Sequence, residues 1–200
     1  MANTSRANGF TPVKTLSGAP WTGMVRYVDS PAADRSSDTT NNHGDIYVGD
    51  PIRIHTDGVV SPADSNMLVA GVVVGIGPTS GGITHGRNGM WKASDLTRRH
   101  LPYDEAGRIY YVPVQDVLFE VETASDLDLS PGELADTNIV ANTAHGSRTT
   151  GLSNVALTTA SDNDVQVVEN VTRPDNDISL TAARHLVIFK TQGLAPTNAT

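Results

Sequence analysis

The stretch RIYYVPVQDVLFEVET, residues 108–123, decides the fold class of this chain. Its second half alternates between the two faces of an extended strand. One face carries Val117, Phe119 and Val121, and the other carries Leu118, Glu120 and Glu122. We therefore predict two strands here, at about 109–115 and 117–123, because a period of two residues is typical of β-structure.

Strand signals recur on both sides of that stretch. The segment MLVAGVVVGIG, residues 67–77, is a continuous apolar run whose β-branched residues favour a buried strand over a helix. Before it, Ile52, Ile54 and Val59 flank an Asp57-Gly58 turn, which predicts a hairpin. Further short strands are predicted at about 138–142, 153–158, 165–172 and 185–191, and helical turns at 94–100 and 131–136. Short strands at this spacing predict an all-β fold, an antiparallel β-barrel or β-sandwich.

The first thirty residues form a different kind of segment. Glycine and proline separate single large apolar residues, so neither a helix nor a long strand fits. We call residues 1–30 the arm, predict that it is extended, and assign residues 31–200 to a single β domain with a polar loop at 31–45 and an insertion at 78–107. The predicted partner-binding anchors of the arm are Arg6, Phe10, Pro12, Lys14, Leu16, Trp21 and Arg26. The arm either wraps its own domain or lies on another subunit, and the sequence leaves both open.

Charge is unevenly distributed along the chain. Residues 1–100 carry 9 basic and 8 acidic side chains, a net charge of +1, whereas residues 101–200 carry 5 and 14, a net charge of −9. A total of −8 argues against nucleic acid as the main partner, because phosphate binding needs a basic face. The first dozen residues are polar and no window approaches the roughly 18 apolar residues of a membrane span, so we also expect no membrane partner.

Motifs for catalysis or cofactor binding are absent from the sequence. The chain has no cysteine, which excludes disulfides and thiolate chemistry, and it lacks the nucleophile-elbow, zinc-protease and P-loop patterns. Glu120 and Glu122 are about 7 Å apart by strand rise, a spacing that glycosidase carboxylates can have, but alternate acids on a solvent-facing strand are far commoner. Two clusters of oxygen ligands, at 126–130 and 162–164, could hold calcium but fit solvated turns better. We expect no enzyme, no cofactor and no metal site.

Several short motifs resemble a known family. They are Ala2-Asn3, Asn8-Gly9-Phe10-Thr11-Pro12, Leu16-Ser17-Gly18-Ala19-Pro20, Gly23, Tyr47-Val48-Gly49-Asp50-Pro51, the run from Val69 to Gly77, Asp116-Val117-Leu118-Phe119-Glu120-Val121, Thr150-Gly151-Leu152-Ser153, Leu157 and Arg173-Pro174-Asp175-Asn176. In these patches the chain resembles capsid decoration (cement) proteins of tailed bacteriophages. The resemblance implies a β-rich body on the outer capsid surface, self-associated around local symmetry axes with a trimer favoured. It also implies extended segments that contact the major capsid protein, and no catalytic residues.

The sequence therefore predicts a virion structural protein, made in the host cytoplasm, that binds the outer capsid surface through many modest contacts. Its predicted partners are the major capsid protein and its own copies. The alternative is a phage surface adhesion module that binds host glycan through exposed loops such as 30–45 and 78–107.

Overall fold

The computed structural model describes residues 3–5, 8–31, 44–56, 58–63, 68–77, 100–102, 105–139, 145–159 and 163–190. This part of the chain is nearly all β, with eleven strands in two antiparallel sheets and one 3-10 turn, η1 (Trp21–Met24). The predicted all-β class is confirmed. Neither sheet closes on itself, so the arrangement is that of a β-sandwich and not of a barrel.

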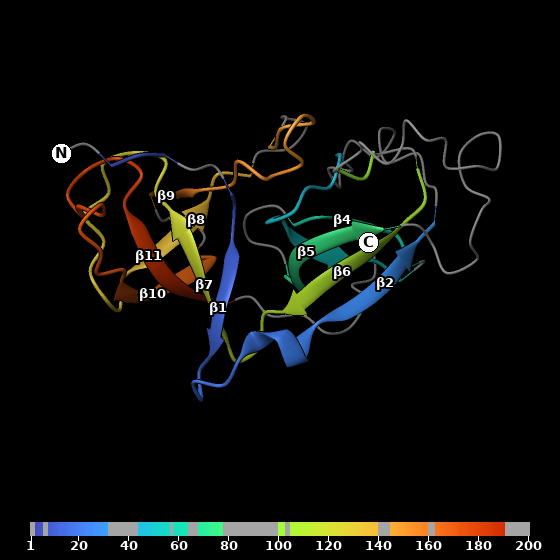
Figure 1. Cartoon of the computed structure of the whole chain (residues 1–200), viewed down its shortest axis with the longest axis horizontal. Helices are drawn as coiled ribbons and strands as arrows, with labels where there is room; N and C mark the ends of the chain where they lie inside the picture. Colours follow the sequence, from blue (N-terminus) through green and yellow to red (C-terminus); the bar gives the residue numbers. More distant parts are fainter. Residues whose placement is uncertain are drawn as a thin grey trace.

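The two sheets occupy the two sides of the molecule in Figure 1. Sheet A contains, in spatial order, β1 (Thr11–Thr15), β7 (Val117–Glu122), β11 (Arg184–Phe189), β10 (Val165–Asn170), β8 (Leu134–Thr137) and β9 (Leu157–Thr159). Sheet B contains β2 (Arg26–Ser30), β6 (Gly107–Pro113), β5 (Gly71–Gly77), β3 (Pro51–Ile54) and β4 (Val60–Pro62). The arm therefore supplies an edge strand to each sheet.

The main hydrophobic core joins the two sheets. Sheet A contributes Phe119 and Phe189, and sheet B contributes Val72 and Val112, all essentially inaccessible to solvent. A second cluster lies on the other face of sheet B, where Ile46, Ile52, Val60, Val73, Leu101 and Ile109 pack together. Sheet B is thus covered on both faces for part of its length, which explains why its central strand β5 is a continuous apolar run rather than an alternating one.

Two short segments carry the chain from one sheet to the other. Residues 16–25 connect β1 to β2, and residues 114–116 connect β6 to β7. The segments are joined by a main-chain hydrogen bond from Leu16 N to Asp116 O of 2.8 Å. Both connecting segments lie at the lower end of the molecule in Figure 1. The arm therefore passes between the two sheets beside residues 114–116.

The structure confirms some local predictions and corrects others. The predicted hairpin forms, with β3 antiparallel to β4 and Gly58 in the left-handed region. The predicted helical turn at 131–136 is wrong: a tight turn with Gly132 at φ 95° leads directly into β8. The strand predicted to start at 138 is wrong: β8 ends at residue 137, because residues 134–137 are the ones that pair with β9 and β10, and residues 138 and 139 belong to no strand. Residues 140–142 lie outside the described residues. Except for His100, the helical turn predicted at 94–100 lies outside the described residues, as do most of the loop at 31–45 and the insertion at 78–107.

Candidate partner-binding surface on the arm

Phe10 is part of the chain's own core. Its ring centroid lies 4.8 Å from that of Phe189 and 6.5 Å from that of Phe119, and the residue is 1% exposed. Pro12 is buried as well. These two predicted anchors are therefore inaccessible to another chain in this conformation, because both side chains are already buried in the chain's own body.

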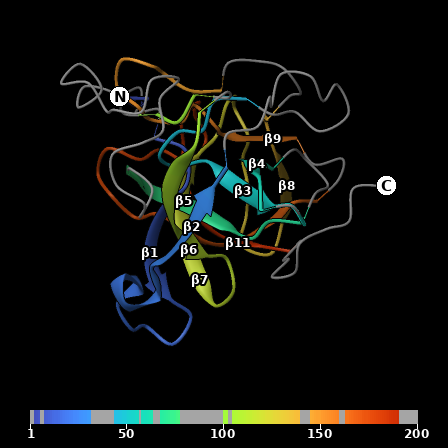
Figure 2. The ribbon, with the colours of Figure 1, turned by 90° about the vertical axis from the view of Figure 1, so that its right-hand side faces the viewer.

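The turn after β1 has the opposite character. Residues 16–20 are all exposed, and Figures 1 and 2 show this turn and η1 extending below the two sheets. Thr15 closes the turn by donating from its N–H to Ala19 O (3.0 Å) and from its hydroxyl to the same oxygen (3.1 Å). Gly18 N donates back to Thr15 O (2.9 Å). The turn is thus exposed and fixed at once, and it presents Leu16 at 55% exposure.

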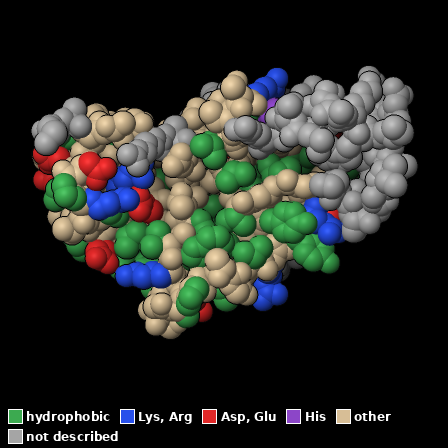
Figure 3. All heavy atoms as spheres, viewed as in Figure 1, with side chains coloured by type: hydrophobic (Ala, Val, Ile, Leu, Met, Phe, Trp, Pro, Cys, Tyr) green, Lys and Arg blue, Asp and Glu red, His purple; other side chains and the backbone are tan. Residues whose placement is uncertain are grey.

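Trp21 occupies an intermediate position. It packs partly against the main core and lines an apolar groove of about 280 Å³ with Phe10, Pro12, Val74 and Leu152 among the other lining residues. The groove opens where β1 of sheet A meets β5 of sheet B. Figure 3 shows apolar side chains gathered along the middle of this face, where β1, β6 and β2 lie in Figure 1.

The basic residues of the arm are placed on its surface. Lys14 Nζ lies 3.9 Å from Glu169 Oε2 with both side chains about half exposed, so this ion pair contributes little to stability. Arg26 is exposed at the start of β2. Arg6 lies outside the described residues.

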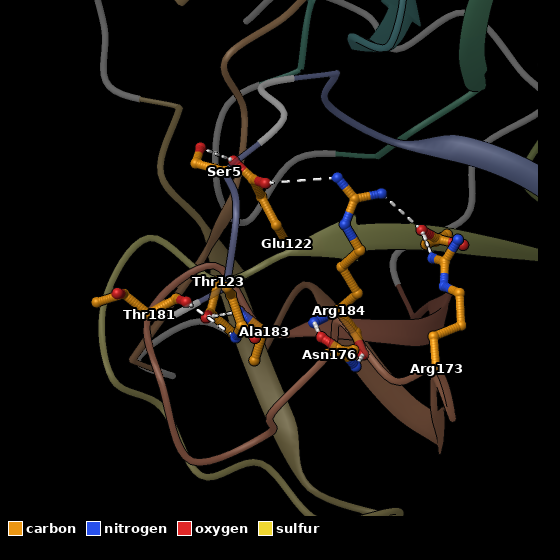
Figure 4. A network of polar contacts seen from close by, with 10 residues as sticks. Ser5, Glu122, Thr123, Arg173, Asn176, Thr181, Ala183 and Arg184 are labelled. Carbon is orange, nitrogen blue, oxygen red and sulfur yellow. Dashed lines mark hydrogen bonds and ion pairs between the residues drawn. The ribbon is translucent and has the colours of Figure 1, made fainter. Parts of the chain in front are cut away.

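Glu120 and Glu122, the pair with glycosidase-like spacing, are tied to arginines. Glu120 Oε1 accepts hydrogen bonds from Arg173 and from Arg184 Nη1 (2.7 Å), while Glu122 Oε1 accepts from Ser5 Oγ at 2.9 Å (Figure 4). The depression beside this network, about 790 Å³, is lined by residues 170–178 and by Asn3 and Thr4, not by either glutamate. The two carboxylates therefore hold the chain's beginning and the segment at 171–184 onto sheet A.

A buried polar cluster at 45–50 escaped the sequence analysis. Tyr47 donates from its hydroxyl to Asp45 (3.2 Å), and Arg148 Nε donates to the same carboxylate oxygen (2.7 Å). His145 Nε2 lies 3.2 Å from Asp50, whose oxygen also accepts from Tyr47 N (2.7 Å). Burial, followed by the charge of Asp45, raises the pKa of Tyr47 to about 12. The bonds from Arg148 to Asp45 and from His145 to Asp50 join segments about a hundred residues apart, so this cluster is a polar tie between distant segments. Among the described residues no three His, Asp or Glu side chains come close enough to hold a metal ion.

No protein-family model, curated protein or solved structure matches the chain. In the part of the chain that the structure describes, no helix is long and apolar enough to cross a membrane.

His185 makes the stability of the body sensitive to acid. The ring is fully buried on β11, with Nδ1 2.8 Å from Asn170 Oδ1 and Nε2 without a partner. Burial lowers the pKa of His185, opposed in part by the charge of Asp128. The unfolded state, with a His pKa of about 6.5, then binds more protons than the folded state, so we expect the free energy of unfolding to fall as pH drops below about 6.5.

Urea titrations at several pH values measure this dependence. The H185Q variant should flatten the slope of the free energy of unfolding against pH. An unchanged slope in that variant would contradict the assignment.

Proposed function

We propose that this chain is a structural protein of a phage virion that binds the outer surface of the capsid, with the turn at residues 15–20 as its principal contact to the shell protein. The resemblance to capsid decoration proteins supplies the partner. The observation that carries the proposal is the exposed turn, whose backbone is hydrogen-bonded to itself and to Asp116.

An exposed apolar side chain on a fixed turn is suited to binding. Ordering a flexible segment at an interface costs free energy, and a turn that is already ordered avoids most of that cost. Leu16 can enter a pocket without rearrangement of the arm, and Val13, 39% exposed on β1, extends the apolar surface next to it. Lys14 and Arg26 add electrostatic fit to an acidic shell surface.

Repetition strengthens a modest contact. A capsid presents the same surface many times, so copies that also contact one another gain affinity from simultaneous engagement. A single substitution in the turn is therefore repeated at every site, and its effect on occupancy is correspondingly large. The adhesion alternative depends on loops 30–45 and 78–107, which lie almost entirely outside the described residues, so it stays a prediction.

L16D is expected to lower binding to purified heads that lack this protein by at least about tenfold, because it places a carboxylate where an apolar contact is buried. Co-sedimentation of the full chain with such heads over a concentration series measures the change. V168D is the matched control, since Val168 is also an exposed apolar residue (38%) but lies on β10, outside the turn. Wild-type binding by L16D, or an equal loss in V168D, would contradict the proposed contact.

A further inference from the structure

Three of the four edge strands are protected against pairing with another strand. β1 carries Pro12 and a shift of register between Pro12 and Lys14. β4 has only three residues, all buried, and ends at Pro62. β9 also has three residues, and its Leu157 carbonyl already accepts a hydrogen bond from Ala124 N (2.8 Å). Short length, proline, bulges and cover are the usual means of blocking an edge.

Among the described residues, β2 shows none of these protections. Its register with β6 runs without interruption from Arg26 opposite Tyr111 to Ser30 opposite Gly107, and it contains neither proline nor bulge. In the described part of the chain, β6 is its only strand neighbour. Tyr27, the second residue of this edge, is 61% exposed. A regular, exposed and partly apolar edge is a template for another strand.

The side chains around Tyr27 are already ordered. The Arg108 guanidinium lies 4.2 Å from the centroid of the Tyr27 ring and donates two hydrogen bonds to Asp29, of 2.7 and 2.8 Å. Tyr110, directly opposite Tyr27 on β6, has its ring centroid 6.4 Å away. Tyrosine and arginine held in place in this way are the residue types that dominate binding energy at protein interfaces.

We propose that β2 pairs antiparallel with β2 of a second copy, across a two-fold axis at Tyr27, so that two copies of sheet B form one continuous sheet. The charges of Arg26 and Asp29 cancel within the strand, so two edges approach without mutual repulsion although the whole chain carries −8. A two-fold axis perpendicular to a sheet places one residue opposite itself. We place the axis at Tyr27 because, at 61% exposure, it is the most exposed large apolar side chain of β2.

This pairing gives a closed dimer in place of the trimer that the family resemblance implies, since a symmetric contact between identical edges joins two copies only. It adds an aromatic row across the interface, with Tyr110 and Tyr27 of each copy side by side. The β2–β2 pairing rests on the proposed function and deepens it, because it says how copies contact one another. Its residues are distinct from the turn that carries Leu16. A failure of L16D to affect capsid binding would leave it untouched.

A single introduced cysteine tests the geometry, because the chain contains none. Directly opposed residues of an antiparallel pair have Cα atoms about 4.5–5.5 Å apart, within the range of about 4.4–6.8 Å that a disulfide spans. Under mild oxidation Y27C is expected to form a covalent dimer at least about tenfold faster than the control V168C, because pairing raises the local thiol concentration. Non-reducing gels over time measure both rates.

Sedimentation equilibrium of the wild-type chain supplies a second measurement that no substitution can disturb. A concentration-dependent monomer–dimer equilibrium supports the pairing. A monomer at all concentrations, a trimer, or a Y27C variant that crosslinks no faster than V168C would overturn it.

Discussion

Replacing Phe10 by alanine is expected to lower the free energy of unfolding by about 3–5 kcal/mol, the usual cost of truncating a buried phenylalanine. The ring enters the core from the residue that precedes edge strand β1, and it contacts aromatic residues of β7 and β11. Its removal leaves a cavity between the sheets that Phe119 and Phe189 cannot fill without leaving their own positions. Urea unfolding of the isolated full chain, at a concentration below that of any self-association, measures the change.

The control is L16A on the same arm. Leu16 is 55% exposed, so its truncation should change stability by no more than about 0.5 kcal/mol in the isolated protein. The difference between the two variants reports whether the arm packs on its own body in solution. Equal, small effects would mean that the arm leaves the core of the free protein and finds its burial elsewhere.

The body of the fold was predictable because its signals are local. The alternation at 117–122 and the apolar run at 71–77 each identify a strand from consecutive residues. Residues 130–133 show that a local helical pattern does not always form a helix. The reciprocal bond of a capping box does form, with Ser130 N donating to Glu133 Oε2 at 2.5 Å, yet Gly132 adopts φ 95° and the next residues join sheet A. Pairing with β9 and β10 outweighs the helical signal of one turn.

The arm was harder to predict because its contacts are remote in sequence. Phe10 and Leu16 are both large apolar residues within two positions of a glycine, and no local sequence feature distinguishes the buried one from the exposed one. Phe10 is buried and Leu16 is exposed because the backbone of residues 8–10 lies in direct contact with that of Gly49. The long-range polar contacts could not be predicted for the same reason. The Asn3 side-chain amide, for example, donates hydrogen bonds to the carbonyl oxygens of Asp177 (2.7 Å) and Thr181 (3.1 Å), more than 170 residues away.

The backbone contact between residues 8–10 and Gly49 predicts a large loss of stability for G49A. Gly49 has φ +96°, and a Cβ there would lie 3.0 Å from Asn8 C and still closer to Asn8 O. Phe10 N donates to Gly49 O (2.9 Å), so the two backbones are in direct contact. The left-handed conformation costs alanine about 1–2 kcal/mol and overpacking costs about 1–3 kcal/mol, so we expect a loss of stability of about 2–5 kcal/mol. Urea unfolding measures the loss.

G18A separates the two contributions. Gly18 also has a positive φ, +84°, but a Cβ there would meet nothing within 4 Å, so this variant carries only the conformational cost of about 1–2 kcal/mol. The excess loss in G49A is then the cost of pushing residues 8–10 away from the body. Hydrogen exchange at the Phe10 amide should accelerate in G49A and not in G18A, because only G49A disturbs the bond to Gly49 O. If both variants lose the same stability and keep that amide protected, the backbone contact relaxes freely, and Phe10 must be held in the core by its ring alone.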